Sequence, residues 1–275
     1  MTDVTLTAAL RSNLLSLQGT QRLLDQTQLR LSTGLKVNSA LDNPSSFFAA
    51  QSLNNRGSDL SSLLDGLGQS VQTVKAADNG ISAITSFLQQ SLALANTALA
   101  NANANSGTNL NAAADAATLA NITGQITQTA ADSSYQGTAL LNGAGNNLVV
   151  TFNESGTSTL TINSVDETAS GLGVGALTLD TTANINTAIA AIQAAITTVR
   201  ADAASLGNNL NIIQTRQDFT ANLINTLKAG ADKLTVADKN EEGAKLLSLQ
   251  TTQQLGITSL SLASQANQSI LRLFQ

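Results

Sequence analysis

The chain has 275 residues and a net charge of −5, and hydrophobic residues make up 42% of it, which is enough for a packed core. Histidine and cysteine are both absent, which removes the usual general base, the thiolate nucleophile, any disulfide and the commonest zinc ligands. Aromatic residues are only 3% of the chain, so packing relies on Leu, Ile, Val and Ala. We therefore expect no enzyme, no metal and no cofactor, and helices packed on helices.

Charge is unevenly distributed along the chain. Residues 1–75 and 200–275 each carry a net charge of +1, whereas residues 76–199 contain seven acidic residues and no Lys or Arg. A middle segment without cations cannot release phosphate counterions, so we expect neither nucleic acid nor an anionic membrane as a partner. The apolar windows are too short and too interrupted for a membrane span.

The N-terminal segment has a leucine at every seventh residue: Leu10, Leu17, Leu24 and Leu31. We expect the companion seam four residues further on, at Leu14, Gln21, Gln28 and Leu35. Half of this companion seam is polar. The pattern predicts an amphipathic helix whose apolar face is diluted.

The only proline is Pro44, and the preceding Asp42 and Asn43 resemble a helix entry. Beyond it, Ile185, Ile189, Ile192, Ile196, Val199, Leu206, Leu210 and Ile213 recur at helical spacing. We expect one helix of about fifty residues over 184–234 and, since such a helix is long for a chain of this length, an elongated rod.

Residues 137–175 hold the clearest strand signals. Segments 148–152 and 159–162 flank a loop containing Gly156, which predicts a β-hairpin where the chain turns back. Gly171, Gly173 and Gly175 lack the Lys-Ser/Thr of a phosphate loop and are read as a flexible loop.

The C-terminal segment has a second stripe, formed by Leu246, Leu249, Gln253, Gly256, Leu260, Ala263, Asn267, Ile270 and Phe274. Asp238 and Glu241 before it form a helix-start pattern, which explains the acidic residues Asp238, Glu241 and Glu242 better than a carboxylate site does. Chain ends normally fray unless something holds them. We therefore expect the two stripes to pair with each other and to form an assembly interface, whose apolar members are Leu10, Leu14, Leu17, Leu24, Leu31, Leu246, Leu249, Leu260, Ala263, Ile270 and Phe274.

Three motifs resemble one family. Residues 30–43, RLSTGLKVNSALDN, closely resemble the flagellin N-terminal signature RLSSGLRINSAKDD. Residues 135–143, YQGTALLNG, resemble FNGxxLLNG, and residues 262–268, LASQANQ, resemble LAQANQ near the flagellin C-terminus. They occur in the expected order, so the chain resembles a short bacterial flagellin with little or no outer-domain insert.

The resemblance implies a mainly α fold of long antiparallel helices with paired terminal coiled-coil helices. It implies an inner-tube domain of 1–42 with 238–275, a helical rod domain of 43–142 with 182–237, and a β-hairpin region, 143–181, in place of outer domains. It also implies export through the flagellar type III apparatus without a cleaved signal peptide, consistent with an N-terminus that lacks a secretory signal. The implied partners are further copies of the chain, the export apparatus, a chaperone, and hook-associated and cap proteins.

The function that the resemblance implies is a structural subunit of the extracellular filament, whose terminal helices fold as they assemble. A hook-filament junction protein, which shares the terminal arms but does not propagate, and a surface adhesin are the alternatives. At Gln90 the family often has an arginine that contacts the Toll-like innate receptor for flagellin, so we expect weak recognition of this chain.

Overall fold

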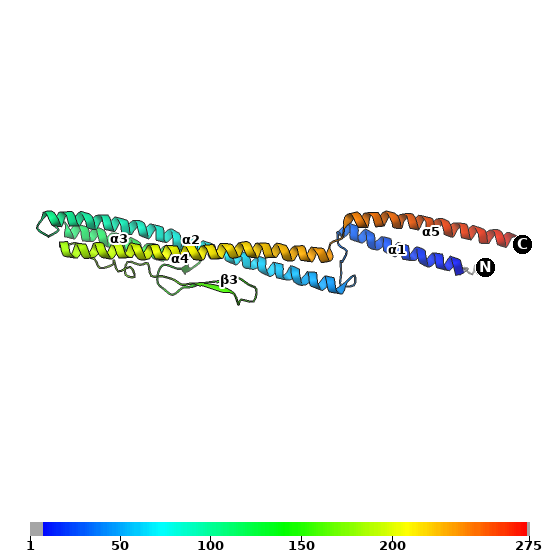
Figure 1. The fold of residues 1–275 in the computed structure, drawn as a ribbon, viewed down its shortest axis with the longest axis horizontal. Coiled ribbons are helices and arrows are strands. Elements are labelled where there is room, and N and C mark those ends of the chain that lie inside the picture. The colour runs from blue at the N-terminus through cyan, green and yellow to red at the C-terminus, as the bar shows by residue number, and fades with distance from the viewer. Residues whose placement is uncertain (1–7, 274–275) are drawn as a thin grey trace. The chain divides into compact units, whose positions relative to one another are not determined.

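The computed structural model describes residues 8–273, which form five helices and two hairpins (Figure 1). The elements are α1 (Ala8–Thr33), α2 (Pro44–Ala104), α3 (Ala112–Asp132), β1 (Ser134–Tyr135), β2 (Thr138–Ala139), β3 (Leu148–Thr151), β4 (Thr159–Ile162), α4 (Thr182–Thr235) and α5 (Lys239–Leu273). Within this range no helix has the length and hydropathy that a membrane span needs. The expected mainly α fold with a small hairpin region is confirmed.

The chain forms two compact units. We call residues up to Arg56 together with those from Thr226 the terminal unit, and Gly57–Asn225 the central unit. The boundaries fall inside α2 and α4, and the hairpin region expected at 143–181 belongs to the central unit. The three-part domain division suggested by the family stays a prediction.

Helix α2 begins where the sequence predicts. Pro44 occupies the first helical position, where its missing N–H is not needed. The Asn43 side chain caps the helix, because the Ser46 N–H donates to its Oδ1 over 3.1 Å. Asp42 closes the preceding turn instead, accepting the Asn38 and Ser39 N–H groups at 3.0 Å each. The helix entry is therefore confirmed at Asn43.

The core of the central unit lies between α2, α3 and α4. Helix α4 has 54 residues and confirms the predicted long helix over 184–234. Its buried face carries Ile185, Ile192, Val199 and Ile213, each at 0% exposure. Those side chains join one core cluster with the faces of α2 and α3, whose fully buried members include Val74, Ile84, Leu88 and Ile126. Helical periodicity therefore predicted this core face correctly.

The predicted hairpin is confirmed as the antiparallel pair β3 and β4, in which Val150 lies opposite Leu160. Its loop is held by Asn153, which accepts the Ser158 N–H at 3.0 Å, and Gly156 has a φ of +70°. A second hairpin, β1 with β2, was not predicted from the sequence. Its turn residues Gln136 and Gly137 both have positive φ, at 49° and 82°. Strands of two residues are too short to show an alternating pattern.

Candidate assembly interface

The terminal unit contains an antiparallel helix pair, α1 beside α5 (Figure 1). Arg30 near the end of α1 forms an ion pair of 3.0 Å with Glu242 near the start of α5. Further along, the Gln253 side-chain amide donates to Gln21 Oε1 over 2.6 Å. Closer to the chain ends, Gly256 lies against Leu17. The predicted pairing of the two terminal segments is thus present within one chain.

A backbone clasp joins the end of α1 to the connection between α4 and α5. Gly34 ends α1 with a φ of +73°, a conformation that glycine adopts without strain. Its carbonyl accepts the Ala237 N–H at 2.9 Å, while the Lys36 N–H donates to the Thr235 carbonyl at 2.7 Å. The family signature at 30–43 therefore includes the turn that brings α1 against α5.

The start of α5 has the predicted cap. Asp238 Oδ1 accepts the N–H groups of Asn240 at 2.8 Å and Glu241 at 3.3 Å. Glu242, one residue further, is 6% exposed and points to Arg30 instead of solvent. The acidic residues at 238–242 thus serve helix capping and helix pairing.

On α1 the predicted leucine heptad is confirmed, but the predicted companion seam is wrong at Leu14, Gln21 and Gln28. Leu10 and Leu24 are buried, and Leu17 and Leu31 are partly buried. Leu14, Gln21 and Gln28 are exposed, whereas Thr20 and Thr27 are 8% and 2% exposed. The second seam thus lies three residues after Leu17 and Leu24, not four. Residues at both spacings are neighbours on one helix face, so the sequence alone did not separate them.

On α5 the predicted stripe faces inward as far as the structure describes it. Leu246, Leu249, Leu260 and Ala263 are all partly buried, and so are the polar or small members of the stripe, Gln253 and Gly256. The side chains of Asn267 and Ile270 and the whole of Phe274 lie outside the described residues. The seam between α1 and α5 is therefore lined by leucines interrupted by Thr, Gln and Gly.

The same two helices expose several large apolar side chains. One of them, Leu14 at 37% exposure, was expected at the interface from the sequence, and the others were not. We call them the outer apolar set: Leu15, Leu23 and Leu29 on α1, and Leu247, Leu255, Ile257 and Leu262 on α5. Their exposures range from 47% for Leu23 to 67% for Leu15, Leu247 and Leu255. The sequence did contain a signal for them, because these large apolar residues occur at helix positions beside the predicted seam and not in it. Such a concentration of exposed apolar side chains is typical of a protein interaction surface.

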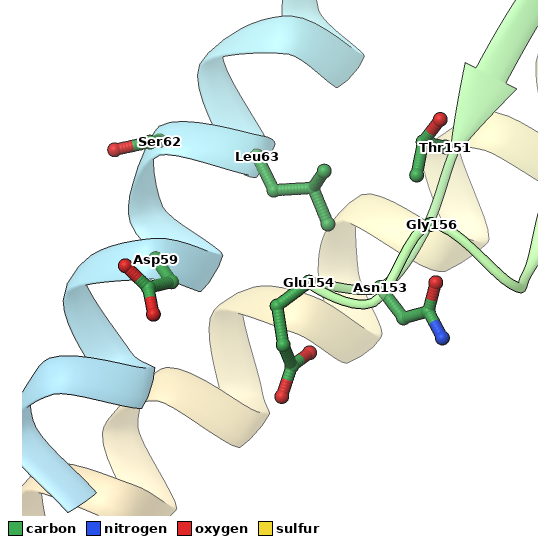
Figure 2. Close-up of a pocket in the computed structure, with 7 residues that line it drawn as sticks. All are labelled: Asp59, Ser62, Leu63, Thr151, Asn153, Glu154 and Gly156. Atoms are coloured by element: carbon green, nitrogen blue, oxygen red, sulfur yellow. The ribbon is translucent and has the colours of Figure 1, made fainter. Parts of the chain in front are cut away.

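The central unit offers no comparable chemical site among its described residues. Figure 2 shows a groove between α2 and the hairpin loop, lined by Asp59, Ser62 and Leu63 of α2 and by Asn153 and Glu154 of the loop, with the Leu63 side chain pointing toward the loop. Across the described residues no group of three or more Asp or Glu side chains is placed to hold a metal ion. Arg216 of α4 lies 5.1 Å above the Phe152 ring, a cation–π contact that fastens the hairpin to α4. Gln90, the receptor-motif position, is exposed on α2.

The chain matches two family models that together cover both helical arms. Residues 5–146 match the bacterial flagellin N-terminal helical region, and residues 189–274 match the bacterial flagellin C-terminal helical region. The chain belongs to the flagellin family. It is 33% identical over 265 residues to flagellin FljM of Caulobacter vibrioides, and 30% identical over 273 residues to a flagellin of Brucella melitensis, with 94% of each chain covered in both cases.

A flagellin crystal structure from Bacillus cereus is similar at a TM-score of 0.47 and 18% identity, covering 56% of this chain and 88% of that one. Membership of the family makes this chain a structural subunit of the extracellular flagellar filament and not an enzyme. The alternatives of a junction protein or an adhesin are not favoured by these relatives. This flagellin is a short form, because only two small hairpins and their loops lie between α3 and α4.

Proposed function

We propose that the outer apolar set is the surface through which this flagellin contacts neighbouring subunits. The observation that carries the proposal is the exposure of these leucines on the two helices whose facing seam is already filled. Burying one exposed leucine contributes about 1.5–3 kcal/mol, so several of them per subunit supply a substantial driving force. The seam residues predicted from the sequence then hold α1 against α5 within one subunit, and the outer apolar set contacts other subunits.

The second part of the proposal is that the helix pair is completed by assembly. The seam is interrupted by Thr20, Thr27 and Gln253, and a helix pair with a diluted seam gains little free energy to offset its ordering entropy. In the free subunit the pair therefore opens readily, and it becomes stable when neighbours cover the outer apolar set. Contacts between different surfaces of successive subunits do not close, which produces a helical filament.

The proposal also includes the partners implied by the family. Termini that order late suit a chain that leaves the cell unfolded through the flagellar export apparatus, accompanied by a chaperone and without a cleaved signal peptide. The absence of cysteine fits this route, since no disulfide has to form after export. Hook-associated and cap proteins are the remaining proposed partners.

A seeded polymerisation assay tests the interface. The double variant Leu247→Ser with Leu255→Ser removes two outer leucines of α5 that are each 67% exposed. We expect its elongation rate to fall at least tenfold while the far-ultraviolet circular dichroism of the monomer stays unchanged. The matched control is Leu110→Ser in the central unit, where an equally exposed leucine, at 71%, lies outside the proposed surface.

Wild-type elongation by the double variant would contradict the proposed interface. Deleting residues 1–30 tests coupled folding separately, because it removes most of α1 and leaves the central unit intact. Undiminished polymerisation of this deletion would overturn that part of the proposal. Electron microscopy of the wild-type product distinguishes a propagating filament, micrometres long, from the short assemblies of a junction protein.

A further inference from the structure

Glu167 is a buried acid in the central unit that filament assembly does not explain. Its side chain is 1% exposed, although it lies in the irregular segment between β4 and α4. Neither of its carboxyl oxygens has a partner in hydrogen-bond geometry. An ionised carboxylate without partners is very costly to bury, whereas a protonated carboxyl costs far less.

The backbone around Glu167 holds its side chain inside the unit. The Glu167 N–H donates to the Leu141 carbonyl at 2.8 Å, and the Val165 N–H donates to the Leu140 carbonyl at 2.8 Å. Between them, Asp166 forms a β-bridge with Asn142. This ladder gives successive side chains opposite directions, so Asp166 is exposed and Glu167 is buried.

The Asp166 side chain locks this alternation. Its Oδ1 accepts the Thr168 N–H at 3.1 Å and the Thr168 hydroxyl at 2.6 Å. A Cβ at Gly143 would lie 2.8 Å from the Asp166 Cβ, so this glycine permits the close approach of the two segments. Glu167 therefore cannot turn toward solvent unless the 163–175 segment detaches from the strand-like residues 140–143.

The charged groups that act on the Glu167 carboxyl are all acidic. Burial is the largest influence, followed by the nearby Asp202 carboxyl of α4 and then by the charge of Asp166. Together they raise the pKa of Glu167 to about 8, and no cation opposes them. A carboxyl that is buried without partners and lies near other acidic groups ionises only at a high cost, so Glu167 keeps its proton at neutral pH.

We propose that the protonated, buried carboxyl of Glu167 keeps the 163–175 segment attached to residues 140–143, and that this segment loosens as the pH rises and the carboxyl ionises. The device is a pH-sensitive latch inside the central unit. It is separate from the outer apolar set, since Glu167 belongs to neither α1 nor α5.

The direction of the pH effect follows from proton binding. When the segment detaches, Glu167 reaches water and its pKa returns to its ordinary value of 4.5. The attached state thus binds the proton more tightly, and its advantage is complete below pH 4.5. Above pH 4.5 the equilibrium constant for detachment rises about tenfold with each pH unit. This rise levels off near pH 8, where the attached state also ionises.

Direct titration is the first test. The chain contains four glutamates, so selective ¹³C labelling of the glutamate carboxyl groups gives four resonances, and the Glu167→Gln variant identifies the one that disappears. We expect the Glu167 resonance of the wild-type subunit to keep its protonated position at pH 6 and to change between pH 7 and 9. A resonance already at its ionised position at pH 6 would overturn the proposal, even if no variant folds.

Hydrogen exchange of the full-length subunit tests the mechanical consequence. After correction for the intrinsic exchange rate, we expect the protection of the amides of Val165 and Glu167 to fall about tenfold per pH unit between pH 5 and 8. Glu167→Gln, which cannot ionise, flattens this dependence. In Asp202→Asn the protection should stop falling at a lower pH than in the wild type. The control Asp78→Asn, at an exposed position on α2, should leave this pH unchanged. Protection that does not depend on pH in the wild type, or an unchanged pH dependence in Glu167→Gln, would refute the latch.

Discussion

The Arg30 guanidinium on α1 lies 3.0 Å from Glu242 Oε1 on α5, and the two residues are 212 positions apart in the chain. The side chains are 23% and 8% exposed, so the pair is largely shielded from solvent. The second oxygen, Glu242 Oε2, is buried without a hydrogen-bond partner. The ion pair therefore makes the stability of the terminal helix pair depend strongly on Arg30.

Replacing Arg30 by Met should destabilise the assembled filament by about 2 kcal/mol per subunit, because Glu242 is left buried and unpaired. Replacing both residues, in Arg30→Met with Glu242→Met, should recover most of the loss, since no buried charge remains. The measurement is the thermal depolymerisation of filaments followed by circular dichroism. Lys245→Met, which removes an exposed charge from α5, is the control and should behave like the wild type. An Arg30→Met filament as stable as the wild type would show that the ion pair contributes nothing.

Gly256 sets the spacing between the terminal helices. A Cβ at this position would lie 2.7 Å from Leu17 Cδ1, so an alanine forces the leucine side chain to move. We expect Gly256→Leu to cost about 1–3 kcal/mol through overpacking. Gly256→Ala should gain about 1 kcal/mol in helix propensity but lose much of it to this contact.

The control for this prediction is Gly19→Ala on α1, where no atom lies within 4 Å of the added Cβ and the full propensity gain is expected. In a Leu17→Ala background the Gly256→Ala change should also show its full gain, because the opposing side chain is absent. Urea or thermal depolymerisation midpoints of the single and double variants measure the coupling. Additive effects of the two substitutions would mean that Leu17 does not limit this position.

Asp42 should make the turn before α2 sensitive to acid. Its carboxylate accepts the backbone N–H groups of Asn38 and Ser39, which lower its pKa below the ordinary 3.8. The folded pKa is depressed, so the stabilisation is complete above pH 3.8 and is lost as the pH falls through the lower folded value. Amide exchange of Asn38 and Ser39 should therefore accelerate only in strong acid, and Asp42→Asn should accelerate it at neutral pH as well. Equal protection of these amides in Asp42→Asn would contradict this assignment.

Gln90 provides a prediction about recognition by the host. Its side chain is exposed on α2, so an arginine at this position fits without repacking. We expect the subunit to activate the Toll-like receptor for flagellin weakly and Gln90→Arg to increase the signal in a reporter-cell assay. Gln90→Lys tests whether charge alone suffices. If the wild-type subunit is as active as an arginine-bearing flagellin, the role assigned to this position is wrong.

Much of the fold follows from local patterns that the sequence displays directly. The long α4, the hairpin of β3 and β4, and the caps at Asn43 and Asp238 each depend on residues close together in the chain. The hairpin of β1 and β2 was missed, because its strands are shorter than any period that can be recognised. The residues proposed for assembly could be only partly predicted from the sequence, since the heptad leucines mark a helix seam without indicating what covers each side of it.

The sequence by itself determined that both ends of the chain form amphipathic helices, with a leucine at every seventh position in the N-terminal one. Only the tertiary structure decided that Thr20 and Thr27, not Gln21 and Gln28, line the seam, and that Leu15 and Leu255 remain outside it. The physical reason is that residues three and four positions along a helix lie on the same face, so the partner helix selects which of them is buried. The same holds for Glu167, because its burial depends on the pairing of its backbone with Leu141, a residue 26 positions earlier in the chain.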